Sequence, residues 1–274
     1  MRQRLTGVLC AVSAFVVLAS CGGGGGGTGP TPTPTSITVT SLGNNLILGQ
    51  TETFTAMFAL SNGTSQPLTG GTWGTDAPGV ATVNPATGLV TGISAGEVTI
   101  FVDAQGLRGS KRITIATYNG MWRGAYSITA CTQTGDFATP AINLCGLFTV
   151  GSQPQVTFNM TQVGTTVTGQ VGLGTLEPSP FTTVFAPNGS LAFQAVFIDD
   201  TFSLVQAWQL SIGTGGQLTG TVVQTWTDST LTGQMVVSGT LVSVLKISAD
   251  QAQDRRTGTV RRSLAEVAAA VIRR

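Results

Sequence analysis

The cysteines are the residues of this sequence best suited to chemistry, because its 274 residues include four cysteines and no histidine. Histidine is the commonest general base and the commonest protein ligand of transition metals, so its absence argues against both functions. Cys10 and Cys21 lie near the N-terminus, and Cys131 and Cys145 lie in the body of the chain. Two cysteines without a histidine form a poor metal site. We therefore expect no metal ion and no cofactor.

Three other patterns are reminiscent of catalytic sites but lack the context that those sites need. The motif G-x-S-x-G surrounds Ser94, yet a strand-like run follows it and no histidine exists to activate the serine. Residues 199–200, both Asp, lie between two apolar runs and predict a hairpin turn. Glu177 with Asp136 remains a conceivable carboxylate pair for glycoside chemistry. We expect no catalytic residues, and a hydrolase is kept only as an alternative.

The first 20 residues read as an export signal. Arg2 and Arg4 precede an apolar run over residues 5–18, and two small residues follow it. The run is shorter than the roughly 20 residues that span a bilayer as a helix. It is therefore interpreted as a signal peptide over residues 1–20.

The end of this signal, Leu18-Ala19-Ser20-Cys21, resembles the lipobox of bacterial lipoproteins. The resemblance implies that Cys21 is lipidated, becomes the mature N-terminus and tethers the protein to a membrane through three acyl chains. An Asp after the cysteine would imply retention in the inner membrane, and Gly22 stands there instead, which favours the outer membrane. The alternative is an ordinary secretory signal cut near Ser20, which would leave Cys21 as a plain thiol.

Export also bears on the second pair of cysteines, because an oxidising compartment favours disulfides. We expect Cys131 and Cys145 to be joined, which would stabilise the fold by about 3 kcal/mol in the chain-entropy model. The alternative is two buried free thiols.

The composition predicts an all-β protein that does not bind nucleic acid. Only 9% of the residues are charged, against about 25% in ordinary domains, and glycine is abundant. Short alternating runs rich in Val, Thr and Gly favour strands and turns. Residues 22–247 carry five Lys or Arg and nine Asp or Glu, so the body offers no basic face to a nucleic acid.

Residues 21–35 are a Gly-rich and Thr-Pro-rich linker, and residues 36–116 form the first predicted domain. About seven short strands at regular spacing predict a β-sandwich. The order of its segments resembles a bacterial immunoglobulin-like domain of group 2, a family found as spacers or adhesive modules in surface proteins. The resemblance places Trp73 in the core and implies no catalytic residue. It is carried by Leu48-Gly49-Gln50-Thr51, Trp73, Val80-Ala81-Thr82-Val83, Gly88-Leu89-Val90-Thr91-Gly92 and Ala95-Gly96-Glu97-Val98-Thr99-Ile100.

Residues 117–247 predict a second domain, an antiparallel up-and-down β-barrel of about eight strands that closes to remove its edges. Its opening Gly-x-Trp, at Trp122, weakly resembles lipocalin-like and avidin-like barrels, and Trp122 is expected inside near one end. Leu147–Val150 is among the expected strands. A barrel of this size is either filled by side chains or holds one small ligand. Phe158, Phe193 and Trp208 are the candidates to line such a ligand site.

Residues 248–274 form a basic tail with six arginines. Leu264, Val267, Ala268 and Val271 follow the spacing of one helical stripe, so the tail reads either as a basic amphipathic helix for an anionic membrane or as a surface helix or frayed end.

Together these features favour a non-enzymatic cell-envelope surface lipoprotein in which the immunoglobulin-like module, as spacer or adhesion unit, presents the barrel. The first alternative is a carrier of a small apolar ligand, and the second is an envelope hydrolase. The expected partners are the membrane, through the lipid anchor, and other surface proteins or glycans.

Overall fold

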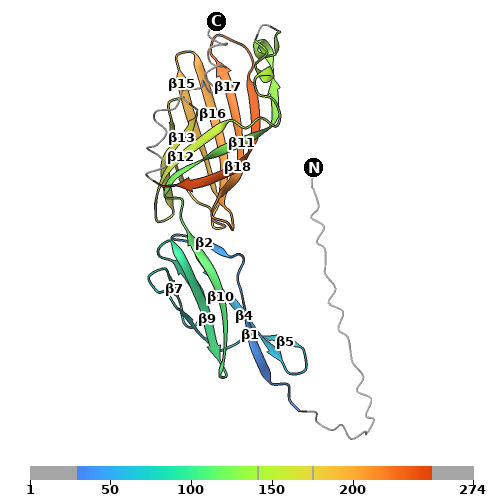
Figure 1. Cartoon of the computed structure of the whole chain (residues 1–274), viewed down its shortest axis with the longest axis vertical. Coiled ribbons are helices and arrows are strands. Elements are labelled where there is room, and N and C mark those ends of the chain that lie inside the picture. Colours follow the sequence, from blue (N-terminus) through green and yellow to red (C-terminus); the bar gives the residue numbers. More distant parts are fainter. Residues whose placement is uncertain (1–29, 141, 175, 249–274) are drawn as a thin grey trace, which may run out of the picture.

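The computed structural model describes residues 30–140, 142–174 and 176–248, and it is all-β as expected. The signal peptide, Cys21, most of the linker and nearly all of the basic tail lie outside the described residues. A small sandwich and a larger barrel follow each other along the chain and stack end to end (Figure 1). Each has its own cluster of buried apolar side chains.

The sandwich contains ten short strands in the described part of the chain, arranged in three sheets with the orders β1-β4-β5, β2-β10-β9-β6 and β3-β8-β7. The alternation of buried and partly exposed side chains in β9 is typical of a strand with one face toward the core. The strands are β1 (Pro34–Thr40), β2 (Asn45–Ile47), β3 (Thr51–Thr53), β4 (Thr55–Leu60), β5 (Ser65–Pro67), β6 (Thr72–Thr75), β7 (Ala81–Val83), β8 (Leu89–Gly92), β9 (Gly96–Ala104) and β10 (Leu107–Ala116).

Trp73 is buried in this core, with 8% of its surface exposed. The backbone of Gly88 crosses the indole so closely that a Cβ there would lie 2.8 Å from the Trp73 ring and 2.8 Å from the carbonyl oxygen of Phe54. Gly88 also has a positive φ of 70°, which only glycine adopts readily. The turn before β8 therefore requires glycine both for its backbone and for its contact with the tryptophan.

The barrel is one antiparallel sheet with the order β14-β13-β12-β11-β18-β17-β16-β15, and the pairing of β18 with β11 brings the last strand back to the first. Every strand after β11 except β15 pairs with the strand before it, which confirms the predicted up-and-down topology. The strands are β11 (Gly120–Gln133), β12 (Gln155–Val163), β13 (Thr166–Leu173), β14 (Ser179–Val184), β15 (Leu191–Asp199), β16 (Phe202–Ile212), β17 (Leu218–Asp228) and β18 (Met235–Ile247).

The barrel is nearly closed, because its two edge strands, β14 and β15, follow each other in the chain and meet at a seam. Phe181 and Phe193 stack across the seam with their ring centres 3.7 Å apart. Thr183 Oγ1 donates a hydrogen bond to the carbonyl oxygen of Ala192 at 2.7 Å. In the described sheet no backbone ladder pairs β14 with β15, so side-chain contacts join these two edges.

One predicted strand is wrong, and one observed strand was not predicted. Leu147–Val150 is not a strand, because the Leu147 N–H donates to the Leu144 carbonyl at 2.8 Å and so belongs to a tight turn. Residues 179–184 do form a strand, β14, although it contains Pro180. Proline has no N–H for a ladder and is tolerated at a sheet edge, which is where β14 lies.

The long connection between β11 and β12 contains two 3-10 helices, η1 (Gly135–Ala138) and η2 (Leu144–Gly146). Phe137, Leu144 and Phe148 of this connection are buried in the barrel core. The ring of Phe148 lies edge-on to Trp226, with the centroids 5.2 Å apart. We call this connection, residues 134–154, the cap segment, because its helical turns lie beside the end of the barrel away from the sandwich (Figure 1).

Candidate functional site

The three aromatic residues predicted to line a ligand site lie on three different strands and are all buried. Phe158 on β12 and Trp208 on β16 are 0% and 1% exposed, and their rings meet edge to face with centroids 5.0 Å apart. Tyr126 on β11 also meets Trp208 edge to face, at 6.2 Å. Phe193 instead stacks on Phe181 at the seam. The structure therefore brings Phe158 and Trp208 into contact, while Phe193 packs against the neighbouring strand.

A hollow of about 350 Å³ lies on the outer wall of the barrel over β15, β16 and β17. It is open to solvent, and most of its side chains are those that alternate outward along these strands. The outward side chains of the lining are neutral and mostly small: Ala192, Gln194, Ala207, Gln209, Thr221 and Val223. Phe193 and Trp208, two of the predicted ligand-site residues, also line the hollow, although their side chains are buried. The hollow offers apolar and amide contacts, but no charged group.

The joint between the sandwich and the barrel is built around Gln162, which sequence reasoning missed. Gln162 is near the end of β12 and is 5% exposed. Its Oε1 accepts hydrogen bonds from the Tyr118 N–H at 2.9 Å and from Thr117 Oγ1 at 3.0 Å. Its Nε2 donates to the carbonyl oxygens of Leu48 at 2.7 Å and Gly164 at 3.1 Å. One buried amide thus ties together the sandwich, the connecting residues and the barrel.

Further contacts surround Gln162. Ile47 of the sandwich is buried within the apolar cluster of the barrel. Asn45 Nδ2 donates to the carbonyl oxygen of Gly213 at 2.9 Å, and Gln50 Nε2 donates to that of Pro187. These bonds reach two different hairpins of the barrel, so they oppose both tilting and rotation of one unit on the other.

Trp122 lies inside the barrel at the joint, as expected, and is 2% exposed. Its indole Nε1 donates to the carbonyl oxygen of Tyr118 at 2.9 Å, and the Tyr118 hydroxyl donates to the carbonyl oxygen of Gly189 at 2.7 Å. The polar atoms of both rings are therefore satisfied while the rings themselves stay dry.

Replacement of Gln162 by Leu should loosen the joint. The change keeps the side chain's size but leaves the Tyr118 N–H and the Leu48 carbonyl without their partner. We expect a loss of about 2 kcal/mol in the free energy of unfolding and faster exchange of the Tyr118 amide hydrogen. Denaturant titration and hydrogen exchange measure the two effects. Gln209→Leu, on the exposed outer wall, is the control; equal behaviour of the two variants would contradict the role of Gln162.

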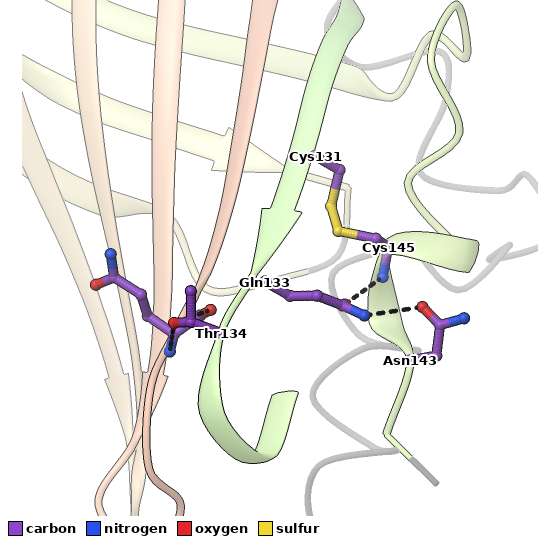
Figure 2. Close-up of a disulfide and its surroundings, with 6 residues drawn as sticks. Cys131, Gln133, Thr134, Asn143 and Cys145 are labelled. Carbon is purple, nitrogen blue, oxygen red and sulfur yellow. Dashed lines mark hydrogen bonds between the residues drawn. A yellow bond between two sulfur atoms is a disulfide. The ribbon is translucent and has the colours of Figure 1, made fainter. Parts of the chain in front are cut away.

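Cys131 and Cys145 form a disulfide in the structure, with Cα atoms 5.6 Å apart. Figure 2 shows the bond joining the end of β11 to η2, beside the hydrogen bonds of Gln133. The Gln133 side chain accepts from the Cys145 N–H at 3.0 Å and donates to Asn143 Oδ1 at 3.0 Å. The disulfide and the Gln133 side chain thereby attach the middle of the cap segment to β11, and backbone hydrogen bonds such as those between Ile128 and residues 151 and 152 attach its end.

Ser94 and Asp136, two of the polar residues considered for catalysis, have structural partners. Ser94 Oγ donates to the Gly79 carbonyl oxygen at 2.7 Å. Asp136 Oδ2 accepts from the N–H and the hydroxyl of Thr232, at 2.7 and 2.8 Å, and these bonds hold the pKa of Asp136 below its usual value. Asp200 lies in the hairpin between β15 and β16 with a positive φ of 53°, as turn chemistry predicts. Within the described residues no three His, Cys, Asp or Glu side chains cluster as metal ligands would.

Comparison with known proteins identifies the sandwich. The sequence of residues 34–115 matches the family model of the bacterial Ig-like domain, group 2. Residues 34–115 are a bacterial Ig-like domain. The Ig-like domain thus includes β1 to β10 almost completely, and the match ends one residue before β10 does. The barrel lies outside this match.

Solved structures with similarity to the chain include two of surface layer protein SbsC. Its domains 4–9 share 14% identity over 76% of this chain and 31% of that one, with a TM-score of 0.27. Its domains 1–6 share 14% identity over 80% of this chain and 41% of that one, also with a TM-score of 0.27. This chain therefore spans less than half of either structure. No curated protein matches the sequence. Among the described residues no helix is long and apolar enough to cross a membrane.

Alkaline pH should destabilise the barrel through its buried tyrosines. Burial raises the pKa of Tyr126 from about 10 to about 12, and burial raises that of Tyr118 as well. Below pH 10 both rings are neutral in the folded and unfolded states, so their contribution is complete. Between pH 10 and 12 the unfolded chain ionises first, and stability should fall by up to about 1.4 kcal/mol per pH unit for each tyrosine. Denaturant midpoints measured between pH 10 and 12 should fall less steeply with pH in Tyr126→Phe than in the unaltered protein. An equal pH dependence in the two proteins would refute the role of Tyr126.

Proposed function

We propose that this chain is a non-enzymatic surface lipoprotein of the cell envelope, in which the Ig-like domain is a spacer that presents the barrel away from the membrane. Lipidation at Cys21 would supply the tether, and the outer membrane is the proposed site of attachment. The proposed partners are other surface proteins or glycans that meet the barrel or the Ig-like domain.

The observation that carries this proposal is that the Ig-like domain begins at one end and meets the barrel at its opposite end. Strand β1 begins at the end of the sandwich opposite the barrel (Figure 1), where Ile37 packs beside Gly109 near the β9–β10 hairpin. The joint around Gln162 lies at the other end of the sandwich. A chain tethered through its N-terminus would therefore be held at one pole and would expose the barrel at the other.

The polar chemistry of the described residues supports a presenting rather than a catalytic role. Asp136 and Ser94 are engaged in hydrogen bonds that join separate loops, to Thr232 and to the Gly79 carbonyl oxygen. Asp228, the one buried carboxylate among the described residues, accepts from Thr201 and Thr230 at 2.6 to 2.8 Å. These hydrogen bonds hold loops together, which gives each of the three side chains a structural role.

The tether is tested by replacing Cys21 with Ser. We expect the variant to be released from the membrane fraction and to lose incorporation of labelled fatty acid, because burial of acyl chains contributes about 0.8 kcal/mol per CH₂. Fractionation and lipid labelling measure both outcomes. Cys10→Ser, within the proposed signal peptide, is the matched control and should stay in the membrane. Retention of unlabelled Cys21→Ser protein in the membrane would overturn the lipoprotein assignment.

A further inference from the structure

Two identical Gln-x-Trp patterns lie side by side inside the barrel. Gln206 and Trp208 are on β16, and Gln224 and Trp226 are on β17. Gln206 is the direct cross-strand partner of Gln224. All four side chains point inward and are at most 2% exposed. The display function proposed above needs none of them.

The two patterns differ in how their polar atoms are satisfied. In the first, Trp208 Nε1 donates to Gln206 Oε1 at 3.2 Å. In the second, Gln224 Nε2 turns to the Tyr126 hydroxyl at 3.0 Å. Gln224 Oε1 and Trp226 Nε1 then have no hydrogen-bond partner among the described residues. The barrel therefore holds one buried acceptor and one buried donor without partners, two residues apart on the same face of a strand.

Buried polar atoms without a hydrogen-bond partner lower the stability of a fold. Nearly all buried polar groups in proteins are therefore bonded to other protein groups or to bound solvent. Reversing the amide of Gln224 does not remove the problem, because Tyr126 could then donate to Oε1 but Nε2 would lack a partner. The nearest inward-facing carboxylate along β17, Asp228, is already bonded to Thr201 and Thr230. The missing partner is therefore a group that does not belong to these strands.

The chemistry of that group follows from the two orphan atoms. With the Gln224 amide oriented as in the structure, it must accept from an indole N–H and donate to an amide oxygen. A carboxylate cannot donate and an ammonium cannot accept, and either charge would be expensive beside the rings of Phe148 and Phe202, which contact Trp226. A hydroxyl does both without charge. The first pattern shows that this spacing brings a glutamine oxygen close to an indole N–H, so one small group can serve both.

We propose that the barrel binds a hydroxyl group between Gln224 and Trp226, supplied either by an enclosed water molecule or by the hydroxyl of a small uncharged organic ligand. The site is independent of the tether and lies outside the Ig-like domain. Gln206 and Trp208, whose amide oxygen and indole N–H are hydrogen-bonded to each other, serve as the internal control for this site.

Indole NMR of the full chain in detergent tests the proposal, because the protein has only four tryptophans and so four indole N–H signals. We expect magnetisation transfer from a non-protein hydroxyl proton to the Trp226 Nε1 hydrogen, and none to that of Trp208. A cross peak at the water frequency identifies water. A cross peak elsewhere, with a hydroxylated compound in an organic extract of the protein, identifies a ligand.

Gln224→Met should abolish the Trp226 cross peak, whereas Gln206→Met should leave it intact. If Gln224→Met fails to fold, the test rests on the unaltered chain, in which a cross peak is expected for the Trp226 indole N–H and not for that of Trp208. Absence of any cross peak at Trp226 in the unaltered chain would overturn the proposal, and so would its persistence in folded Gln224→Met.

Discussion

Replacement of Trp208 by Ala is expected to lower the free energy of unfolding of the barrel by about 3–5 kcal/mol. The indole is 1% exposed and meets the rings of Phe158 and Tyr126 from across the barrel. Removing it would leave a cavity in the middle of the interior and would also leave Gln206 Oε1 without its donor. Because β16 is hydrogen-bonded along both of its sides, to β15 and to β17, the strands around the indole resist collapse into the space.

Denaturant titration followed by circular dichroism measures this loss. The matched control is Val223→Ala, on the outer wall of the adjacent strand, where the side chain is 42% exposed and the expected change is within about 0.5 kcal/mol. If Trp208→Ala were as stable as Val223→Ala, the barrel could not be filled around Trp208. The carrier alternative, a hollow barrel lined by Phe158, Phe193 and Trp208, would then regain support.

Removal of the disulfide by the double change Cys131→Ala and Cys145→Ala should cost about 3 kcal/mol, since the bond closes a loop over a sequence separation of 14 residues. The effect should be concentrated at the cap segment, whose Phe137 and Phe148 close the barrel. Hydrogen exchange in residues 134–154 should accelerate more than in β16 or β17.

The reductant response separates the disulfide from the substitutions themselves. A reducing agent should lower the stability of the unaltered protein toward that of the double variant and should leave the double variant unchanged. A reductant-insensitive protein whose double variant is equally stable would show that the cap is held without the bond.

Several features were predictable because local sequence pattern dictates them. The alternation of Trp208, Leu210 and Ile212 with Gln209 and Ser211 predicts a strand with one dry face, and β16 is such a strand, with Trp208 and Leu210 buried and Ile212 partly buried. Short turns between consecutive strands predict neighbours in an up-and-down order, which the barrel follows. The segments around Trp73 are specific enough to indicate the Ig-like domain from residue types and their order alone, and the family match confirms it.

Other predictions failed or were absent where distant contacts override local pattern. Leu147–Val150 has the residue types of a strand, but it directly follows η2 and the disulfide. Its backbone is therefore held in a turn, and Phe148 is buried in the barrel core. β14 contains a proline that argues against a strand, yet its place at the sheet edge makes the missing N–H harmless. Neither fact can be read from a window of a few residues.

The sequence by itself determined the class of the fold, the Ig-like domain and the alternation that divides each barrel strand into a dry and a wet face, because these depend on residue type and on a period of two. Only the tertiary structure decided the partners of the buried amides. Gln162 joins Leu48 to Tyr118 across the joint, and Gln224 turns to Tyr126 and leaves Trp226 unsatisfied. Hydrogen bonds of this kind join residues far apart in the chain, so they exist only once the strands have closed around them.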